Sequence, residues 1–203
     1  MNLLTETLPQ TARIDGADVP IHTDFRTGIR FELLMQEDIP GSEKVLRALR
    51  LYFGDAVPSD AEKAVDAILW FYSCGQDEES ETPKSGKTKQ AYSFEQDSEL
   101  FYASFLAVYG IDLSTASMHW WTFRALLHGL PADCELKKVM GYRVADLTGM
   151  SKAQRKTYEK LRKAYALKKS ATVQSAIGLA ERDRRMKEYV ERRFNDAYGK
   201  NKG

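Results

Sequence analysis

The apolar positions of the chain are densest between residues 92 and 142, where they recur at the spacing of three consecutive helices. The first predicted helix ends at Gly110, the second begins near Ser114 or Ser117, and the third ends at Gly141. Burying an aromatic side chain contributes about 25 cal/mol per Å² of apolar area. We therefore expect the first two of these helices to pack together and to nucleate the fold. The aromatic residues involved are Phe94, Phe101, Tyr102, Phe105, Tyr109, Trp120, Trp121 and Phe123.

Three more helices are predicted upstream, each with a capping residue and an apolar stripe. The expected caps are Thr23 or Asp24 for the first helix, Ser42 for the second, and a capping box at residues 59–62 for the third. The expected stripes are Phe25, Ile29 and Leu33; then Val45, Leu46, Leu49 and Phe53; then Val65, Ile68, Leu69 and Tyr72.

Residues 11–22 predict a small β-hairpin. Asp15-Gly16 is a residue pair that tolerates the positive φ angles of a tight turn, and apolar residues flank it on both sides. Pro20 has no backbone N–H to donate, so the second strand suits only an edge position. A hairpin of this size needs support, and we expect it to lie on the helices.

The chain ends in a basic segment. Residues 151–203 hold 16 Lys and Arg against 6 Asp and Glu, whereas the first 150 residues hold 14 against 23. The net charges of +10 and −9 sum to the overall +1. The narrow apolar stripes of this segment cannot form a core alone, so it must pack on the body, on a copy of itself or on a partner.

These patterns predict a mostly α fold: a compact helical domain with an N-terminal β-hairpin and a basic helical C-terminal arm. The predicted boundaries are 1–22 for the hairpin segment, 23–150 for the helical core and 151–203 for the arm. Residues 76–91 contain no large apolar residue and are expected to form a solvated loop within the core domain.

The composition argues against a membrane or secreted protein. The longest uncharged run, 100–111, is far shorter than the roughly 20 residues of a membrane-spanning helix. The N-terminus is acidic and polar where a signal peptide would be basic and then apolar. Cys74 and Cys134 form no CxxC pair. We expect a soluble intracellular protein with two buried, reduced thiols.

The residue chemistry predicts no catalytic, metal or cofactor site. The GKTK sequence at 86–89 lacks the first glycine of a phosphate-binding loop, because Glu81 stands in its place. His119 and His128 fall on opposite faces of one predicted helix and cannot share a metal ion; the remaining histidine and the cysteines lack ligand spacing. A carboxylate cluster at 95–99 is explained more simply by the positive end of a helix.

The arm leaves three interpretations open. Its apolar stripes could dock on a protein through Tyr158, Leu161, Tyr165, Met186, Tyr189 and Phe194. Its basic residues could instead neutralise nucleic-acid phosphates through Lys152, Arg155, Lys156, Arg162, Lys163 and Lys168. Glu159 and later acidic residues interrupt this charge, and i, i+4 partners such as Glu188 and Arg192 also fit an ordinary solvated helix.

Several segments together resemble one known family. They are TDFRTGIRFELL (23–34) after the hairpin, YSFEQDSELFYASFLAVYGIDL (92–113), HWWTFRALLHGLP (119–131) and GYR (141–143), in this order. The chain thereby resembles the bacteriophage gene-product-fifteen proteins over about residues 10–167. The genes of that family typically lie between those for the major tail protein and the tape measure protein of siphophages.

The resemblance implies a non-enzymatic tail assembly chaperone that acts in the host cytoplasm. Such a protein would keep the long helical tape measure protein soluble and recruit tail tube subunits to it. The family brings no catalytic residues and no cofactor. The expected partners are therefore the tape measure protein, tail tube protein or a second copy of the chain, through the arm or an exposed part of the aromatic block. The alternative is a nucleic-acid-associated phage protein that uses the basic arm.

Overall fold

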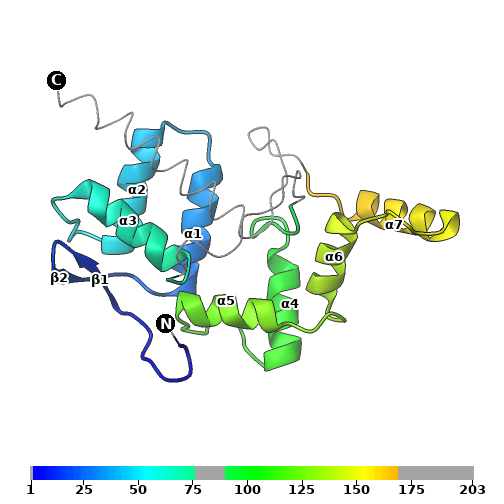
Figure 1. The fold of residues 1–203 in the computed structure, drawn as a ribbon, viewed down its shortest axis with the longest axis horizontal. Helices are drawn as coiled ribbons and strands as arrows, with labels where there is room; N and C mark the ends of the chain where they lie inside the picture. The colour runs from blue at the N-terminus through cyan, green and yellow to red at the C-terminus, as the bar shows by residue number, and fades with distance from the viewer. Residues whose placement is uncertain (1, 76–89, 169–203) are drawn as a thin grey trace. The chain divides into compact units, whose positions relative to one another are not determined.

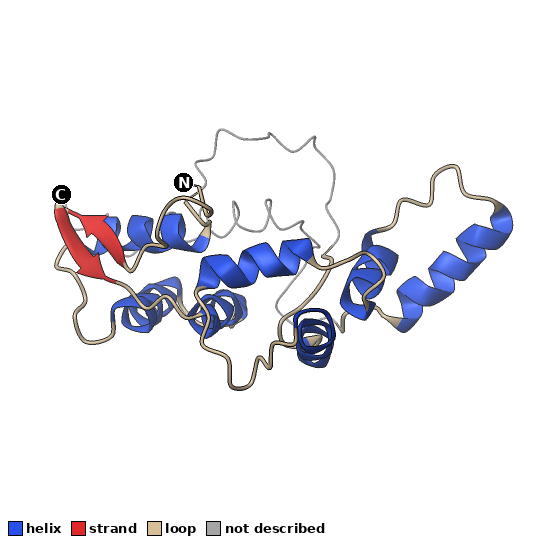
Figure 2. Ribbon diagram, turned by 90° about the horizontal axis from the view of Figure 1, so that it is seen from below, coloured by secondary structure: helices blue, strands red, loops and turns tan. Residues whose placement is uncertain are grey.

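The computed structural model describes residues 2–75 and 90–168 (Figure 1). Within these residues the fold is mostly α, as predicted, with seven helices and one two-stranded antiparallel hairpin (Figure 2). No helix in this part of the chain has both the length and the apolar character to cross a membrane. The elements are β1 (Thr11–Ile14), β2 (Ala17–Pro20), α1 (Phe25–Gln36), α2 (Gly41–Phe53), α3 (Ala61–Tyr72), α4 (Ser98–Tyr109), α5 (Trp120–Gly129), α6 (Glu135–Val144) and α7 (Lys152–Ala164).

The described residues fall into two compact units, where the sequence predicts one core over 23–150. Unit one comprises 2–75 and 117–125, and unit two comprises 90–116 and 126–168. The boundary runs through α5 and through the predicted loop 76–91, which has no large apolar residue to bury. The predicted packing of α4 on α5 stays a prediction, because α4 belongs to unit two and the aromatic half of α5 to unit one.

The hairpin of unit one is confirmed. Asp15 and Gly16 have φ angles of 51° and 80°, as the tight turn requires. Ala12 and Ile14 on β1 are buried, and β1 contacts α3. The side chain of Lys63 on α3 pairs with Asp15 in the turn. The hairpin therefore lies on the helices of its unit, as expected.

The predicted stripe of helix α1 is correct only in part. Phe25 is buried, but Ile29 and Leu33 are only half-buried, whereas Gly28 and Phe31 are buried. A Cβ atom at position 28 would overlap the indole ring of Trp120. The indole can thus lie directly against the helix backbone, and the buried face turns toward it.

Two tryptophans of α5 donate hydrogen bonds to carbonyl groups at the C-terminal end of α3. The Nε1–H of Trp120 donates to the carbonyl of Tyr72 at 2.9 Å, and that of Trp121 donates to the carbonyl of Phe71 at 2.7 Å. The last carbonyls of a helix have no partner inside the helix, so the indoles satisfy groups that burial would otherwise penalise. The Trp120 ring also stacks on Tyr72, with centroids 5.3 Å apart.

Several predicted helix boundaries are wrong. Helix α2 begins at Gly41 after Pro40, so Ser42 is not its cap, and Leu46 on its expected stripe is 43% exposed. Helix α3 is capped by Asp60, whose carboxylate accepts from the backbone N–H of Lys63, and no capping box forms there. Helix α6 continues past Gly141 to Val144.

Unit two is a row of three helices in which α6 lies between α4 and α7 (Figure 1). Leu136 and Val139 of α6 are fully buried, and the backbone N–H of Leu136 donates to the hydroxyl of Ser104 on α4. Phe94, Phe101 and Tyr92 form an aromatic cluster with ring centroids 4.8–5.3 Å apart. Gly110 ends α4 in the left-handed conformation, as predicted.

Candidate functional site

Helix α4 carries an exposed apolar surface. Tyr102 and Leu106 are 38% and 43% exposed, and Ala103 and Ala107 beside them are also exposed. We call these four residues the α4 apolar face. At 100° per residue they lie within one sector of the helix, away from the buried Phe101 and Phe105 of the same helix.

The α4 apolar face exists because the helix is apolar on nearly all sides. No charged residue occurs from Leu100 to Ile111, so the side that does not pack on unit two has no polar residues to present to water. Glu99 stands at the N-terminal edge of the face and Gly110 at its C-terminal edge. A helix surface of this kind suits contact with the apolar stripe of another helix.

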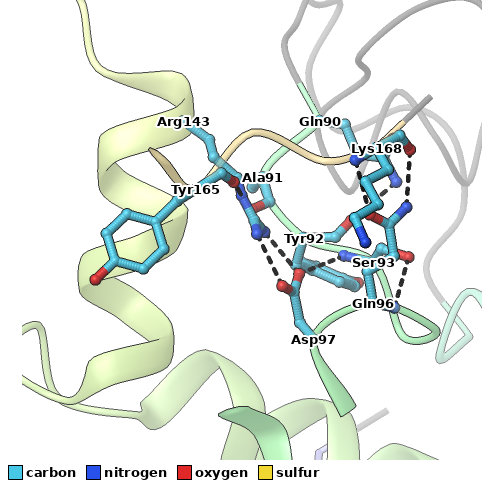
Figure 3. A network of polar contacts seen from close by, with 9 residues as sticks. All are labelled: Gln90, Ala91, Tyr92, Ser93, Gln96, Asp97, Arg143, Tyr165 and Lys168. Carbon is cyan, nitrogen blue, oxygen red and sulfur yellow. Dashed lines mark hydrogen bonds and ion pairs between the residues drawn. The ribbon is translucent and has the colours of Figure 1, made fainter. Parts of the chain in front are cut away.

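A buried ion pair joins the start of α4 to α6 in unit two. The guanidinium of Arg143 on α6 binds both carboxylate oxygens of Asp97, at 2.6 and 2.8 Å (Figure 3). The two side chains are 8% and 4% exposed. Arg143 also donates to the carbonyls of Ala91 and Tyr165, and Asp97 accepts from the backbone N–H of Ser93. One arginine thereby joins the segment before α4, helix α6 and the end of α7.

A second contact holds the residues after α7. The side-chain amide of Gln96 donates to the carbonyl of Lys168 at 2.9 Å and accepts from its N–H at 2.8 Å (Figure 3). Gln90 and Ala91, the last residues of the predicted solvated loop, are half-buried here rather than solvated. The start of the arm is thus a packed part of unit two.

The predicted partner-binding stripe of the arm faces α6. The ring of Tyr142 on α6 lies 6.1 Å from that of Tyr158 and stacks on Tyr165 at 5.8 Å. Tyr158, Leu161 and Tyr165 are all half-buried. Their contact surface is therefore partly occupied by the protein itself. Met186, Tyr189 and Phe194, the other predicted contacts, lie outside the described residues.

The basic residues named for nucleic-acid contact divide into two groups. Arg155 and Arg162 donate to the backbone carbonyls of Leu147 and Ala145, so their side chains help to hold α7 in place. The lysines of this group are exposed, as is Arg155, but unlike the arginines they have side chains that no hydrogen bond or ion pair to the described residues holds. These lysines are Lys152, Lys156, Lys163 and Lys168.

The two histidines do not share a helix, contrary to the prediction from the sequence, because α5 begins at Trp120 and only His128 lies on it. His119 precedes α5; its Nε2 is 2.9 Å from the Pro9 carbonyl, and its Nδ1 accepts from the N–H of Trp121. Both ring nitrogens of His119 therefore lie within hydrogen-bond distance of backbone groups. Among the described residues, no group of three or more His, Cys, Asp or Glu is placed to hold a metal ion. Cys74 and Cys134 are not joined by a disulfide, and both are half-buried, where the sequence predicts buried thiols.

Sequence reasoning missed the role of Asp97. The carboxylates at 95–99 were attributed to the N-terminus of a helix, and this still fits the exposed Glu95 and Glu99. Asp97 occupies the N-cap position of α4, yet its side chain makes no capping hydrogen bond and pairs with Arg143 instead. One signal in the sequence could have indicated this pair: Arg143 belongs to the GYR sequence that carries the family resemblance.

A comparison with known protein families decides the identity. A family model described as Bacteriophage Gp15 protein matches residues 4–167, which include all seven described helices. The chain belongs to the bacteriophage Gp15 family. The chain is thus a phage structural or morphogenesis protein. Searches of curated proteins and of solved structures find no match to it.

Proposed function

We propose that this Gp15 protein is a non-enzymatic tail assembly chaperone that acts in the host cytoplasm. It would bind amphipathic helices of the tape measure protein through the α4 apolar face, and tail tube subunits would be recruited to that complex. The family membership supports a role in phage morphogenesis. The tail gene neighbourhood implied by the resemblance points to this particular step.

The exposed α4 apolar face is the observation that carries the proposal. A long helical protein with apolar stripes aggregates unless those stripes are covered, and a helix with an exposed row of small and aliphatic residues can cover them. Leu106 and Tyr102 supply apolar area, while Ala103 and Ala107 allow a second helix to approach closely. Such binding needs neither a cofactor nor a catalytic group.

The experiment is co-expression of the full chain with fragments of the tape measure protein from the same phage. We expect the fragments to become soluble and to co-elute with the chain on size-exclusion chromatography. The double variant Tyr102→Ser/Leu106→Asp should lose about 2 kcal/mol or more of binding free energy, roughly a 30-fold weaker complex, because a central apolar contact is removed.

Leu46→Asp on α2 is the matched control. Leu46 and Leu106 have the same exposed fraction, 43%, so the two substitutions add the same charge at equally accessible positions. The control should bind like the unmodified chain. If fragments spanning the whole tape measure protein stay insoluble and none co-elutes with the unmodified chain, the chaperone proposal is wrong.

A further inference from the structure

One face of α7 consists of lysines. Lys152, Lys156, Lys160 and Lys163 are all exposed, and their spacing of four, four and three residues places them within about 80° of one another around the helix. This lysine face lies opposite the half-buried stripe that packs on Tyr142. Within the described residues none of the four lysines has an ion-pair partner, and Glu159 is the acidic residue beside them, so the face carries a net positive charge.

An acidic counterpart lies on α3. Glu62, Asp66 and Trp70 follow one another at intervals of four residues, so they form one line along the helix, and all three are exposed. Neither carboxylate has a basic partner in the part of the chain that the structure describes. Lys63 beside them is engaged by Asp15 and Asp60. We call this line the α3 acidic face.

The two faces match in charge and in spacing. Both repeat every four residues, which is about 6 Å along a helix. When two lysines of α7 lie opposite Glu62 and Asp66, a third lysine falls at the position of Trp70. The indole ring there is 39% exposed and can accept a cation on its face. The match in spacing is the same for a parallel and for an antiparallel arrangement of α7 on α3.

We propose that copies of this chain associate head to tail, with the lysine face of one copy on the α3 acidic face of the next. The occupant is a second copy because the same chain carries both charges: residues 1–150 have net charge −9 and residues 151–203 have +10. The total of +1 leaves little long-range repulsion between copies. Because the two faces differ, the contact is heterologous and lets more than two copies join.

Nucleic acid would compete for the same lysines, and three observations favour the protein partner. Glu159 lies next to the lysine face, where it would repel phosphates but can pair with a cation of a facing protein. The two arginines of α7, Arg155 and Arg162, each already donate one hydrogen bond to a backbone carbonyl, which competes with bidentate binding of a phosphate. The first 150 residues carry net negative charge, which disfavours a polyanion.

The test is sedimentation velocity of the full chain, without any partner, over a concentration series at 50 and 300 mM salt. At low salt we expect the average mass to rise above the 23.1 kDa of one chain as concentration increases. At 300 mM salt it should return toward one chain, because exposed charge pairs are screened. The variants Lys152→Glu/Lys156→Glu/Lys160→Glu and Glu62→Lys/Asp66→Lys should each remain single chains at low salt.

An equimolar mixture of the two variants provides the decisive measurement, because the reversed faces are again complementary and should restore association. Lys84→Glu/Lys87→Glu/Lys89→Glu changes the net charge as much as the α7 variant but leaves both faces intact, so it should still associate. The proposal is overturned if the unmodified chain shows no concentration dependence, or if the mixture does not associate. It is equally overturned if the lysine face binds duplex DNA while the chain stays a single copy. Failure to bind tape measure fragments would not affect any of these readouts.

Discussion

At the scale of single residues, two buried tyrosines of unit one differ in one hydrogen bond. The hydroxyl of Tyr72 donates to a carboxylate oxygen of Glu32 at 2.9 Å. The hydroxyl of Tyr52, which is fully buried, has no hydrogen-bond partner among the described residues. Burial also raises the pKa of Tyr52 well above its usual value of about 10, so this group stays uncharged. A buried hydroxyl without a partner costs free energy that an apolar ring would not.

The substitution Tyr52→Phe is therefore expected to keep or raise stability. Removing the hydroxyl removes a desolvation cost of about 1–3 kcal/mol at most and leaves the ring contacts with Phe31 and Phe71 in place. Tyr72→Phe is the matched control, and its effect on the free energy of unfolding should have the opposite sign. It removes a hydrogen bond to a buried carboxylate and should destabilise the protein by about 1.5–3 kcal/mol. Urea unfolding followed by circular dichroism measures both. A loss of more than about 1 kcal/mol in Tyr52→Phe would show that the hydroxyl has a partner.

Single residues also show where sequence reasoning failed. Helical spacing predicts Phe25, Ile29 and Leu33 as the stripe of α1, and it fails at the last two because it takes account of side chains only and Gly28 has none. The buried face is set by a ring from α5 that lies on that glycine, a contact between residues 92 positions apart. Helical spacing carries no information about such a partner. It correctly predicted the stripe of α3, where Val65, Ile68 and Leu69 are all buried.

At the scale of elements, the Arg143–Asp97 pair determines how α7 is held. Arg143 lies on α6 and binds residues of the segment before α4 and the residue that follows α7. A charged pair this deeply buried is costly to break, because the remaining charge cannot regain its hydration. The α4 apolar face and the lysine face both belong to helices that this pair stabilises.

The substitution Asp97→Asn is predicted to destabilise unit two by about 3–5 kcal/mol, because it leaves the guanidinium of Arg143 buried without its counter-charge. Glu43→Gln on α2 is the control: it breaks an ion pair with Arg47 whose side chains are 42% and 48% exposed, and should cost at most about 1 kcal/mol. Thermal unfolding followed by helix content compares the two. Equal, small effects would mean that the buried pair does not hold the unit together.

The existence and order of the helices could be predicted from the sequence, but the functional surfaces could not. Gly110 and the spacing of Phe101 and Phe105 define α4 from local information. Which side of an all-apolar helix remains exposed depends on what packs against the other side, and this requires the position of α6. The stripe of Tyr158 and Leu161 was assigned to a partner because the sequence gives no sign that Tyr142 occupies it.

At the scale of the whole molecule, stability should depend on pH through His119. Burial lowers the pKa of His119 below its ordinary value of about 6.5, and the hydrogen bond to the Pro9 carbonyl opposes this only in part. The unfolded chain then binds a proton at a pH where the folded protein does not. The free energy of unfolding therefore falls as pH drops below about 6.5, and it levels off below the pKa of the folded state.

Urea midpoints at pH 7.5 and 5.5 test this prediction, in a range where carboxylates remain ionised. We expect a lower midpoint at pH 5.5, and a smaller pH dependence in His119→Gln, which can keep one backbone hydrogen bond but cannot titrate. A variant with the same pH dependence as the unmodified chain would assign the effect to another group.

The chain contains three tryptophans, at positions 70, 120 and 121, and all of them lie in unit one. Intrinsic indole fluorescence of the unmodified protein is therefore a probe of that unit alone, while the amide signal in the far ultraviolet averages over both. A partner that quenches or shifts the emission changes the surroundings of the indoles in unit one, whereas the α4 apolar face contains no indole. The distribution of one residue type thus provides a label-free means of assigning a binding event to one unit or the other.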